Sequence, residues 1–141
     1  MCIRDSYAHH PSEIKATLES LKLISKKNII TIIEPHRFSR LTSFLPDFIK
    51  SLSESNSIFV LPVYSAGEKL KSRINSLSFC KLLEKKFKRK YVYLVTNEKK
   101  FFENLEKRIT PEDNIIFLGA GRSTIIAVSY THLTLPTTPY V

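Results

Sequence analysis

Residues 28–33 read Asn28-Ile29-Ile30-Thr31-Ile32-Ile33, an almost uninterrupted run of apolar, β-branched side chains. Such a run is typical of a strand in a parallel sheet that helices cover on both faces. The next residues, Glu34-Pro35-His36-Arg37-Phe38-Ser39-Arg40, are mostly polar or charged. The sequence therefore predicts a buried strand that ends in a polar turn.

The same pattern recurs on both sides of this run. Short apolar runs at 57–61, 91–95 and 114–118 predict three further strands. Amphipathic stretches predict four helices: one that Pro11 opens, one at about 39–53 with a local bend at Pro46, one near 76–87 and one at 99–108. We expect an α/β fold, a three-layer Rossmann-like domain with right-handed crossovers and a mainly parallel sheet.

The composition is that of one globular domain. The 141 residues include 22 Lys and Arg against 13 Asp and Glu, a net charge of +9, and 43% are hydrophobic. This balance excludes intrinsic disorder and leaves no room for two large domains. No apolar run reaches the roughly 20 residues of a membrane-spanning helix, and the chain start lacks a secretion signal. We therefore expect a cytoplasmic protein without membrane insertion.

The two cysteines, Cys2 and Cys80, lie far apart in the sequence. Neither belongs to a CxxC motif or to a Cys/His spacing typical of zinc sites. We expect no disulfide framework and no metal site, and we expect Cys80 to be a buried apolar residue.

Ligands of parallel sheets bind at the carboxyl ends of the strands, so the residues after each predicted strand are the candidates. Arg37 and Arg40 stand three apart after the 28–33 strand. If a helix opens there, both guanidinium groups lie on one face beside its N-terminus, which favours a carboxylate or a phosphate. The alternative is that the two arginines only solvate a surface turn.

Two histidines, His9 and His10, precede the first predicted helix. They could bind a metal, transfer protons or only shape the helix start. Adjacent side chains diverge in most backbones, so a shared metal is the least favoured of these roles. Similarly, residues 64–69 after the second strand either form a binding loop or only turn the chain.

A glycine-containing turn, Gly119-Ala120-Gly121, follows the last predicted strand. It is compatible with close approach of a phosphate or substrate. The GxGxxG dinucleotide motif is incomplete, however, because Thr124 occupies the third glycine position, and no GxxxxGK[ST] phosphate loop occurs in the chain. We expect no ATP phosphate site within these 141 residues.

The densest charge cluster is the run Lys85-Lys86-Phe87-Lys88-Arg89-Lys90. Cations at a helix end complement the helix dipole, so a solvated helix terminus explains the run. No recognised nucleic-acid motif accompanies it, and we expect no nucleic-acid partner.

The two ends of the sequence look foreign to the rest. Residues 1–6 back-translate to ATG TGT ATA AGA GAC AGN, which resembles the transposon end used to prepare sequencing libraries. Residues 128–137 back-translate to GTC TCT TAT ACA CAT CTG ACG CTG CCG ACG, which begins with the reverse complement of that element. We expect residues 1–6 and 128–141 to be adapter scars that stay outside the fold, and residues 7–127 to be a fragment of a larger protein.

Four motifs in this order resemble the C-terminal domain of the Mur ligases of peptidoglycan synthesis. They are Tyr-Ala-His-His-Pro-Ser-Glu at 7–13, Glu-Pro-His-Arg-Phe-Ser-Arg at 34–40, Tyr-Ser-Ala-Gly-Glu at 64–68 and Leu-Gly-Ala-Gly at 118–121. The form of the second motif is similar to that of the ligases that join L-alanine to UDP-N-acetylmuramate. A related murein peptide ligase shares the His-His-Pro element and is the alternative. The family has two acidic residues before the tyrosine, where this chain has Asp5 and Ser6, and we assign Asp5 no role.

The resemblance implies a reaction and a division of labour between domains. ATP phosphorylates the muramoyl carboxylate, the amine of L-alanine attacks the acyl phosphate, and a tetrahedral intermediate loses phosphate. An N-terminal domain holds UDP-N-acetylmuramate, a central domain holds ATP and Mg²⁺, and the C-terminal domain closes over them with the amino acid. No catalytic residue is assigned to the domain present here.

By the same resemblance, Arg37 and Arg40 would bind the alanine carboxylate, with Tyr7 and His9 beside it, while His10 and His36 would shape the site. Two other functions remain open from the residues alone. The net charge of +9 motivates a basic nucleic-acid-binding module, and Gly119-Ala120-Gly121 motivates a free-standing Rossmann-like nucleotide-binding protein.

Overall fold

The computed structural model describes residues 2–65, 67, 75–119 and 126. It contains one five-stranded sheet with the strand order β1-β5-β2-β3-β4. The strands are β1 (Cys2–Ser6), β2 (Ile29–Ile33), β3 (Ser57–Val60), β4 (Tyr91–Leu94) and β5 (Asn114–Leu118), and every neighbouring pair is parallel. The predicted α/β class and parallel sheet are confirmed.

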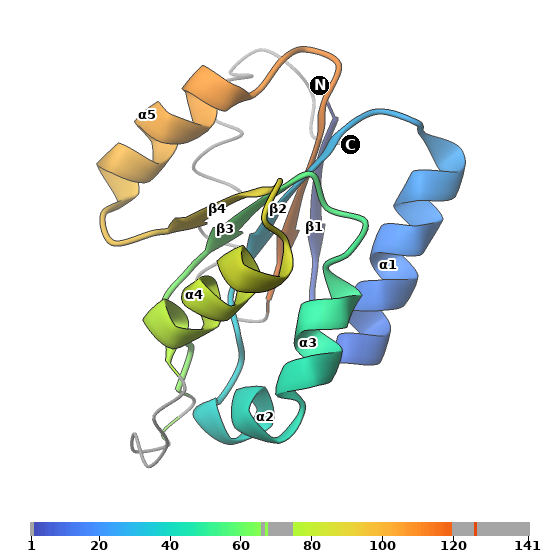
Figure 1. Cartoon of the computed structure of the whole chain (residues 1–141). Coiled ribbons are helices and arrows are strands. Elements are labelled where there is room, and N and C mark those ends of the chain that lie inside the picture. Colours follow the sequence, from blue (N-terminus) through green and yellow to red (C-terminus); the bar gives the residue numbers. More distant parts are fainter. Residues whose placement is uncertain (1, 66, 68–74, 120–125, 127–141) are drawn as a thin grey trace.

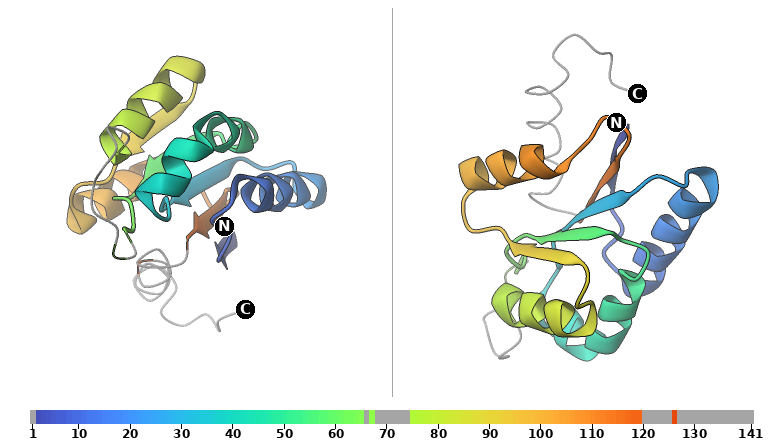
Figure 2. Two further views of the ribbon diagram at one scale, coloured as in Figure 1. Left: turned by 90° about the horizontal axis from the view of Figure 1, so that it is seen from below. Right: turned by 45° about the horizontal axis from the view of Figure 1, so that its top comes forward.

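Five helices connect the strands (Figure 1). They are α1 (Pro11–Ile24), α2 (Phe38–Ser43), α3 (Leu45–Ser51), α4 (Ser76–Lys86) and α5 (Glu98–Arg108). Helices α1, α3 and α4 cover one face of the sheet and α5 lies on the other, which Figure 2 also shows. The described residues thus form the predicted three layers.

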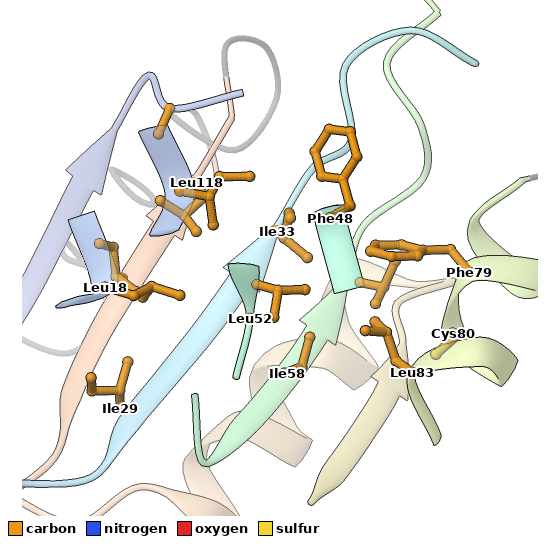
Figure 3. Packing of buried hydrophobic residues seen from close by; sticks show 14 of the residues in the cluster. Leu18, Ile29, Ile33, Phe48, Leu52, Ile58, Phe79, Cys80, Leu83 and Leu118 are labelled. Carbon is orange, nitrogen blue, oxygen red and sulfur yellow. The ribbon is translucent and has the colours of Figure 1, made fainter. Parts of the chain in front are cut away.

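Each face of the sheet has its own apolar core. The core under α1, α3 and α4 is built around Leu18, Ile33, Phe48, Phe79 and Leu118 (Figure 3). The core under α5 contains Ile32, Phe59, Phe101, Leu105 and Phe117. Because β2 and β5 are fully buried between these cores, both strands are continuous apolar runs.

Cys80 lies in the first core and is 3% exposed, as predicted. Burial, with a smaller contribution from the nearby Glu84 carboxylate, raises the pKa of its thiol to about 11. The thiol therefore stays protonated near neutral pH and is not an activated nucleophile.

The segment 39–53 forms two short helices instead of the one bent helix expected. Helix α2 ends at Ser43, Phe44 joins the two, and Pro46 lies in the first turn of α3. Proline has no N–H to donate, and the first turn of a helix is where none is needed. Pro46 therefore begins a new helix, and the prediction of a bend within one helix was wrong.

The expectation that residues 1–6 stay outside the fold was also wrong. Residues Cys2–Ser6 form β1, the edge strand, which pairs with β5 from Cys2 opposite Asn114 to Ser6 opposite Leu118. Ile3 packs against the core under α5, whereas Arg4 lines an open hollow of about 410 Å³ beside α1. A strand ladder forms through backbone groups, so these residues can pair at the sheet edge although Arg4 and Asp5 break the apolar pattern of a buried strand.

Candidate functional site

The carboxyl ends of β1, β2 and β3 bring three sequence-distant turns together at one edge of the sheet. Tyr7 and His9 follow β1, the turn 34–40 follows β2, and Tyr64 follows β3. The rings of His9 and His36 are 5.2 Å apart between centroids, and those of His36 and Tyr64 are 5.3 Å apart. The structure therefore places His9, His36 and Tyr64 in one ring cluster beside the arginine turn, at the sheet edge where parallel strands place their ligands.

Arg40 is tied to the centre of this cluster. Its Nη1 atom lies 2.9 Å from Nδ1 of His36. Because a guanidinium can only donate, Nδ1 of His36 must accept this hydrogen bond with its lone pair. His36 thus orients the Arg40 guanidinium and carries its own ring proton on Nε2.

His9 carries its ring proton on the other nitrogen, Nδ1. Its Nδ1 atom lies 2.7 Å from the carbonyl oxygen of Tyr7, which can only accept, so Nδ1 carries the proton. The Nε2 atom of a neutral His9 is then an acceptor. The Tyr7 side chain itself is 68% exposed and reaches out from the cluster.

His10 points elsewhere. Its Nδ1 atom lies 3.2 Å from the Ser12 hydroxyl, and its ring lies 5.0 Å from that of Phe44. The two adjacent histidines therefore have different surroundings. Within the described ranges, no three His, Cys, Asp or Glu side chains gather as a metal site would require.

Arg37 adopts an unusual backbone conformation. Its φ is 68° and its ψ is 135°, and it is the only residue other than glycine with a positive φ in the described part of the chain. Its N–H donates to the carbonyl oxygen of Tyr64 at 2.7 Å, and its side chain is exposed. Strained conformations of this kind cost about 1 to 3 kcal/mol and are concentrated at functional sites.

The predicted helix opening at the arginines is present, but it is short. Helix α2 begins directly after Arg37 and has six residues, so its dipole adds little. The positive charge of the site therefore comes mainly from the guanidinium groups of Arg37 and Arg40. An exposed Arg37 and a half-buried Arg40 in one turn suit a small carboxylate or a phosphate.

Replacing Arg37 with glycine should show how much stability the positive φ of this residue costs. Glycine adopts positive φ without a Cβ clash, so we expect Arg37→Gly to raise the free energy of unfolding by about 1 kcal/mol. Urea denaturation measures this change. Arg89→Gly, in the exposed turn before β4, is the control and should not stabilise the chain. A destabilised Arg37→Gly variant would contradict the strained geometry.

Tyr64 contacts this cluster, although the sequence analysis did not name it as a site residue. The sequence left 64–69 as either a binding loop or a turn, and the only signal was its place after a strand. Tyr64 and Ser65 also line a cavity of about 220 Å³ on the α5 side, together with Glu34, Leu61, Val95 and Thr96 among others. Residues 66 and 68–69 lie outside the described part of the chain.

The glycine turn is described only at Gly119, whose N–H donates to the carbonyl oxygen of Ser6 at 3.1 Å. Ala120, Gly121 and Thr124 lie outside the described residues.

The basic run 85–90 is partly used in packing. Lys85 and Lys86 end α4, as predicted, and the Nζ atom of Lys90 donates to the carbonyl oxygen of Ser53. Burial lowers the pKa of Lys90. Among the described helices, none has the length and apolar character needed to cross a membrane.

Comparisons with known proteins agree with the motifs. The family model described as "Mur ligase, glutamate ligase domain" matches residues 1–121. The UDP-N-acetylmuramate–L-alanine ligase of Desulfatibacillum aliphaticivorans is 36% identical over 120 residues, which cover 84% of this chain and 26% of that ligase. The chain therefore spans about a quarter of the length of this relative.

Two solved structures share the fold. The UDP-N-acetylmuramate-alanine ligase of Thermotoga maritima aligns with a TM-score of 0.65 and 24% identity, over 96% of this chain and 27% of that one. A domain of a UDP-N-acetylmuramate:L-alanyl-γ-D-glutamyl-meso-diaminopimelate ligase of Haemophilus ducreyi aligns with a TM-score of 0.65 and 17% identity, over 93% of this chain and 89% of that domain.

Proposed function

The chain belongs to the Mur ligase family as a C-terminal domain, and on this basis we propose that it supplies the amino-acid site of a ligase that joins L-alanine to UDP-N-acetylmuramate. The observation that carries the proposal is the arginine pair at the end of β2, with Arg40 held by His36 at 2.9 Å. A paired guanidinium site fits the carboxylate of a free amino acid.

Each residue of the cluster has a role in this proposal. Arg37 and Arg40 bind the alanine carboxylate, and His36 orients Arg40. Tyr7 and His9 flank the bound amino acid, and His10 shapes the start of α1 from outside the ring cluster. Fixing the carboxylate leaves the amine free to attack the muramoyl acyl phosphate. An oriented nucleophile reacts faster, because its translational and rotational freedom is already lost.

ATP and Mg²⁺ would be bound mostly outside this domain, which closes over them. The sequence has no phosphate loop, and the described part has no cluster of metal ligands. We propose that the rest of the full-length protein binds ATP, Mg²⁺ and UDP-N-acetylmuramate, and that the ligase acts in the cytoplasm. No step at the arginine cluster is assigned to these groups.

We further propose that residues 1–6 and 128–141 are encoded by adapter DNA and that residues 7–127 are the Mur ligase domain. The complementary back-translations of the two ends support this division. Sequencing the source genome upstream of the Tyr7 codon tests it. The expected result is an in-frame GxxxxGK[ST] motif, and a genomic copy of the codons for residues 1–6 would refute the division.

A chimeric ligase tests the function. Residues 7–127 replace the matching segment of the Desulfatibacillum aliphaticivorans ligase, which keeps its own residues up to that point. We expect phosphate release that requires UDP-N-acetylmuramate, ATP and L-alanine. Activity with L-alanyl-γ-D-glutamyl-meso-diaminopimelate in place of L-alanine would favour the murein peptide ligase alternative. Inactivity with both, beside an active parent ligase and with a folded chimera, would reject the proposal.

A further inference from the structure

Tyr64 holds the backbone of the arginine turn from the neighbouring strand. Its carbonyl oxygen accepts the N–H of Arg37 at 2.7 Å, and its own N–H donates to the carbonyl oxygen of Pro35 at 2.8 Å. His36 and Tyr64 thereby form an isolated parallel bridge beyond the ends of β2 and β3. The backbone of the turn is thus hydrogen-bonded to Tyr64 on both sides of His36.

These two backbone hydrogen bonds explain how Arg37 keeps its conformation. A φ of 68° in a residue with a Cβ atom persists only where the surroundings determine it. The bond from the Arg37 N–H to Tyr64 acts directly on that residue. The same backbone position sets the direction in which the Arg37 side chain leaves the turn.

The Tyr64 ring supports the second arginine. The ring lies 5.3 Å from the His36 ring, and His36 accepts the hydrogen bond of Arg40 on its Nδ1 atom. Tyr64 is 41% exposed, so core packing alone does not account for its placement. One residue therefore contacts the backbone of Arg37 and the partner of Arg40.

From these contacts we propose that Tyr64 is a positioning residue for the arginine pair. It acts through the backbone of Arg37 and the ring of His36, and it sets the angle between the two guanidinium groups. The claim about amino-acid affinity rests on the proposed function. The claim about the conformation of the turn does not.

The first test uses this chain and measures amide hydrogen exchange at Arg37. Tyr64→Ala keeps the backbone groups of the bridge but removes the ring that lies 5.3 Å from the His36 ring, and we expect exchange at the Arg37 amide to become at least about tenfold faster. Tyr64→Phe keeps the ring and should remain within about twofold of the original chain. Phe44→Ala is the matched control, because Phe44 is 38% exposed and its ring lies 5.0 Å from His10.

The second test uses the chimeric ligase. Tyr64→Ala should raise the KM for L-alanine about tenfold, with kcat and the KM values for ATP and UDP-N-acetylmuramate changed less than about threefold. Tyr64→Phe should restore the original KM, and Phe44→Ala should leave it within about twofold. Circular dichroism verifies folding, and Tyr64→Leu, which keeps apolar bulk, replaces Tyr64→Ala if the latter does not fold.

The outcomes separate this proposal from the proposed function. Unchanged Arg37 exchange in folded Tyr64→Ala or Tyr64→Leu overturns the positioning role. An unchanged KM for L-alanine in these variants, in an enzyme whose arginine variants do raise it, overturns it as well. If the arginine variants leave the KM unchanged, the proposed function fails, and the exchange result still decides whether Tyr64 positions the turn.

Discussion

Replacing Arg37 or Arg40 with lysine in the chimeric ligase is expected to lower kcat/KM for L-alanine by about 10-fold to 150-fold, a loss of roughly 1.5 to 3 kcal/mol. A guanidinium holds a carboxylate through two hydrogen bonds in a fixed plane, and the lysine ammonium cannot reproduce this geometry. Arg40→Lys also removes the planar guanidinium whose Nη1 atom donates a hydrogen bond to Nδ1 of His36 at 2.9 Å. Steady-state kinetics with varied L-alanine measures the effect.

The lower kcat/KM should come mainly from a higher KM for L-alanine. Some loss of kcat is also expected, because binding of the carboxylate also orients the amine. The KM values for ATP and UDP-N-acetylmuramate should change far less. Arg89→Lys, in an exposed turn before β4, is the matched control and should have no effect. Normal alanine kinetics with impaired ATP or sugar binding would assign both arginines to another ligand.

Deleting residues 1–6 from the 141-residue chain is expected to lower the free energy of unfolding by roughly 2 kcal/mol or more. The deletion removes the five-residue ladder between β1 and β5 and the packing of Ile3. Each ladder hydrogen bond contributes about 1 kcal/mol net, and the cost of ordering the strand offsets part of the sum. The deletion also leaves β5 as an open strand edge, which favours association between chains.

Urea denaturation measures the loss of stability, and light scattering measures the association. Ile3→Ala should reproduce part of the loss, whereas Leu23→Ala, at a residue 87% exposed, should leave stability unchanged. Equal unfolding midpoints for the deleted and the complete chain would mean that β1 is not paired in solution.

The sequence predicted the four strands that are apolar runs, β2 to β5. β2 and β5 needed only their apolar runs, since both lie between the two cores. β1 was missed because Arg4 and Asp5 interrupt the apolar pattern, and because an edge strand can be held largely by its backbone. The break at Phe44 was missed for a different reason, since a proline in an amphipathic stretch can either bend a helix or begin a new one.

The structure brings His9, His36 and Arg40 together, but the sequence did not predict the contacts that join His36 to Arg40 and to Tyr64. The strand-end rule singled out Arg37 and Arg40 because it depends only on the order of elements, whereas His9 was noted only as a histidine before the first predicted helix. The role of Tyr64 depends on which strands are neighbours, and no local pattern contains that information. The positive φ of Arg37 was equally hidden, because arginine carries no sequence signal for a conformation that usually selects glycine.

The strand order determines when each strand can pair during synthesis of the chain. Strand β5 lies between β1 and β2, so β1 finds its partner only when β5, the last of these five strands to be synthesised, is complete. A nascent chain that ends before Asn114 holds β2 and β3 side by side but offers β1 nothing to pair with. Contacts between such distant parts of a chain close slowly. On the ribosome, the edge that carries Tyr7 and His9 would therefore assemble last, after the arginine turn and Tyr64 have already met.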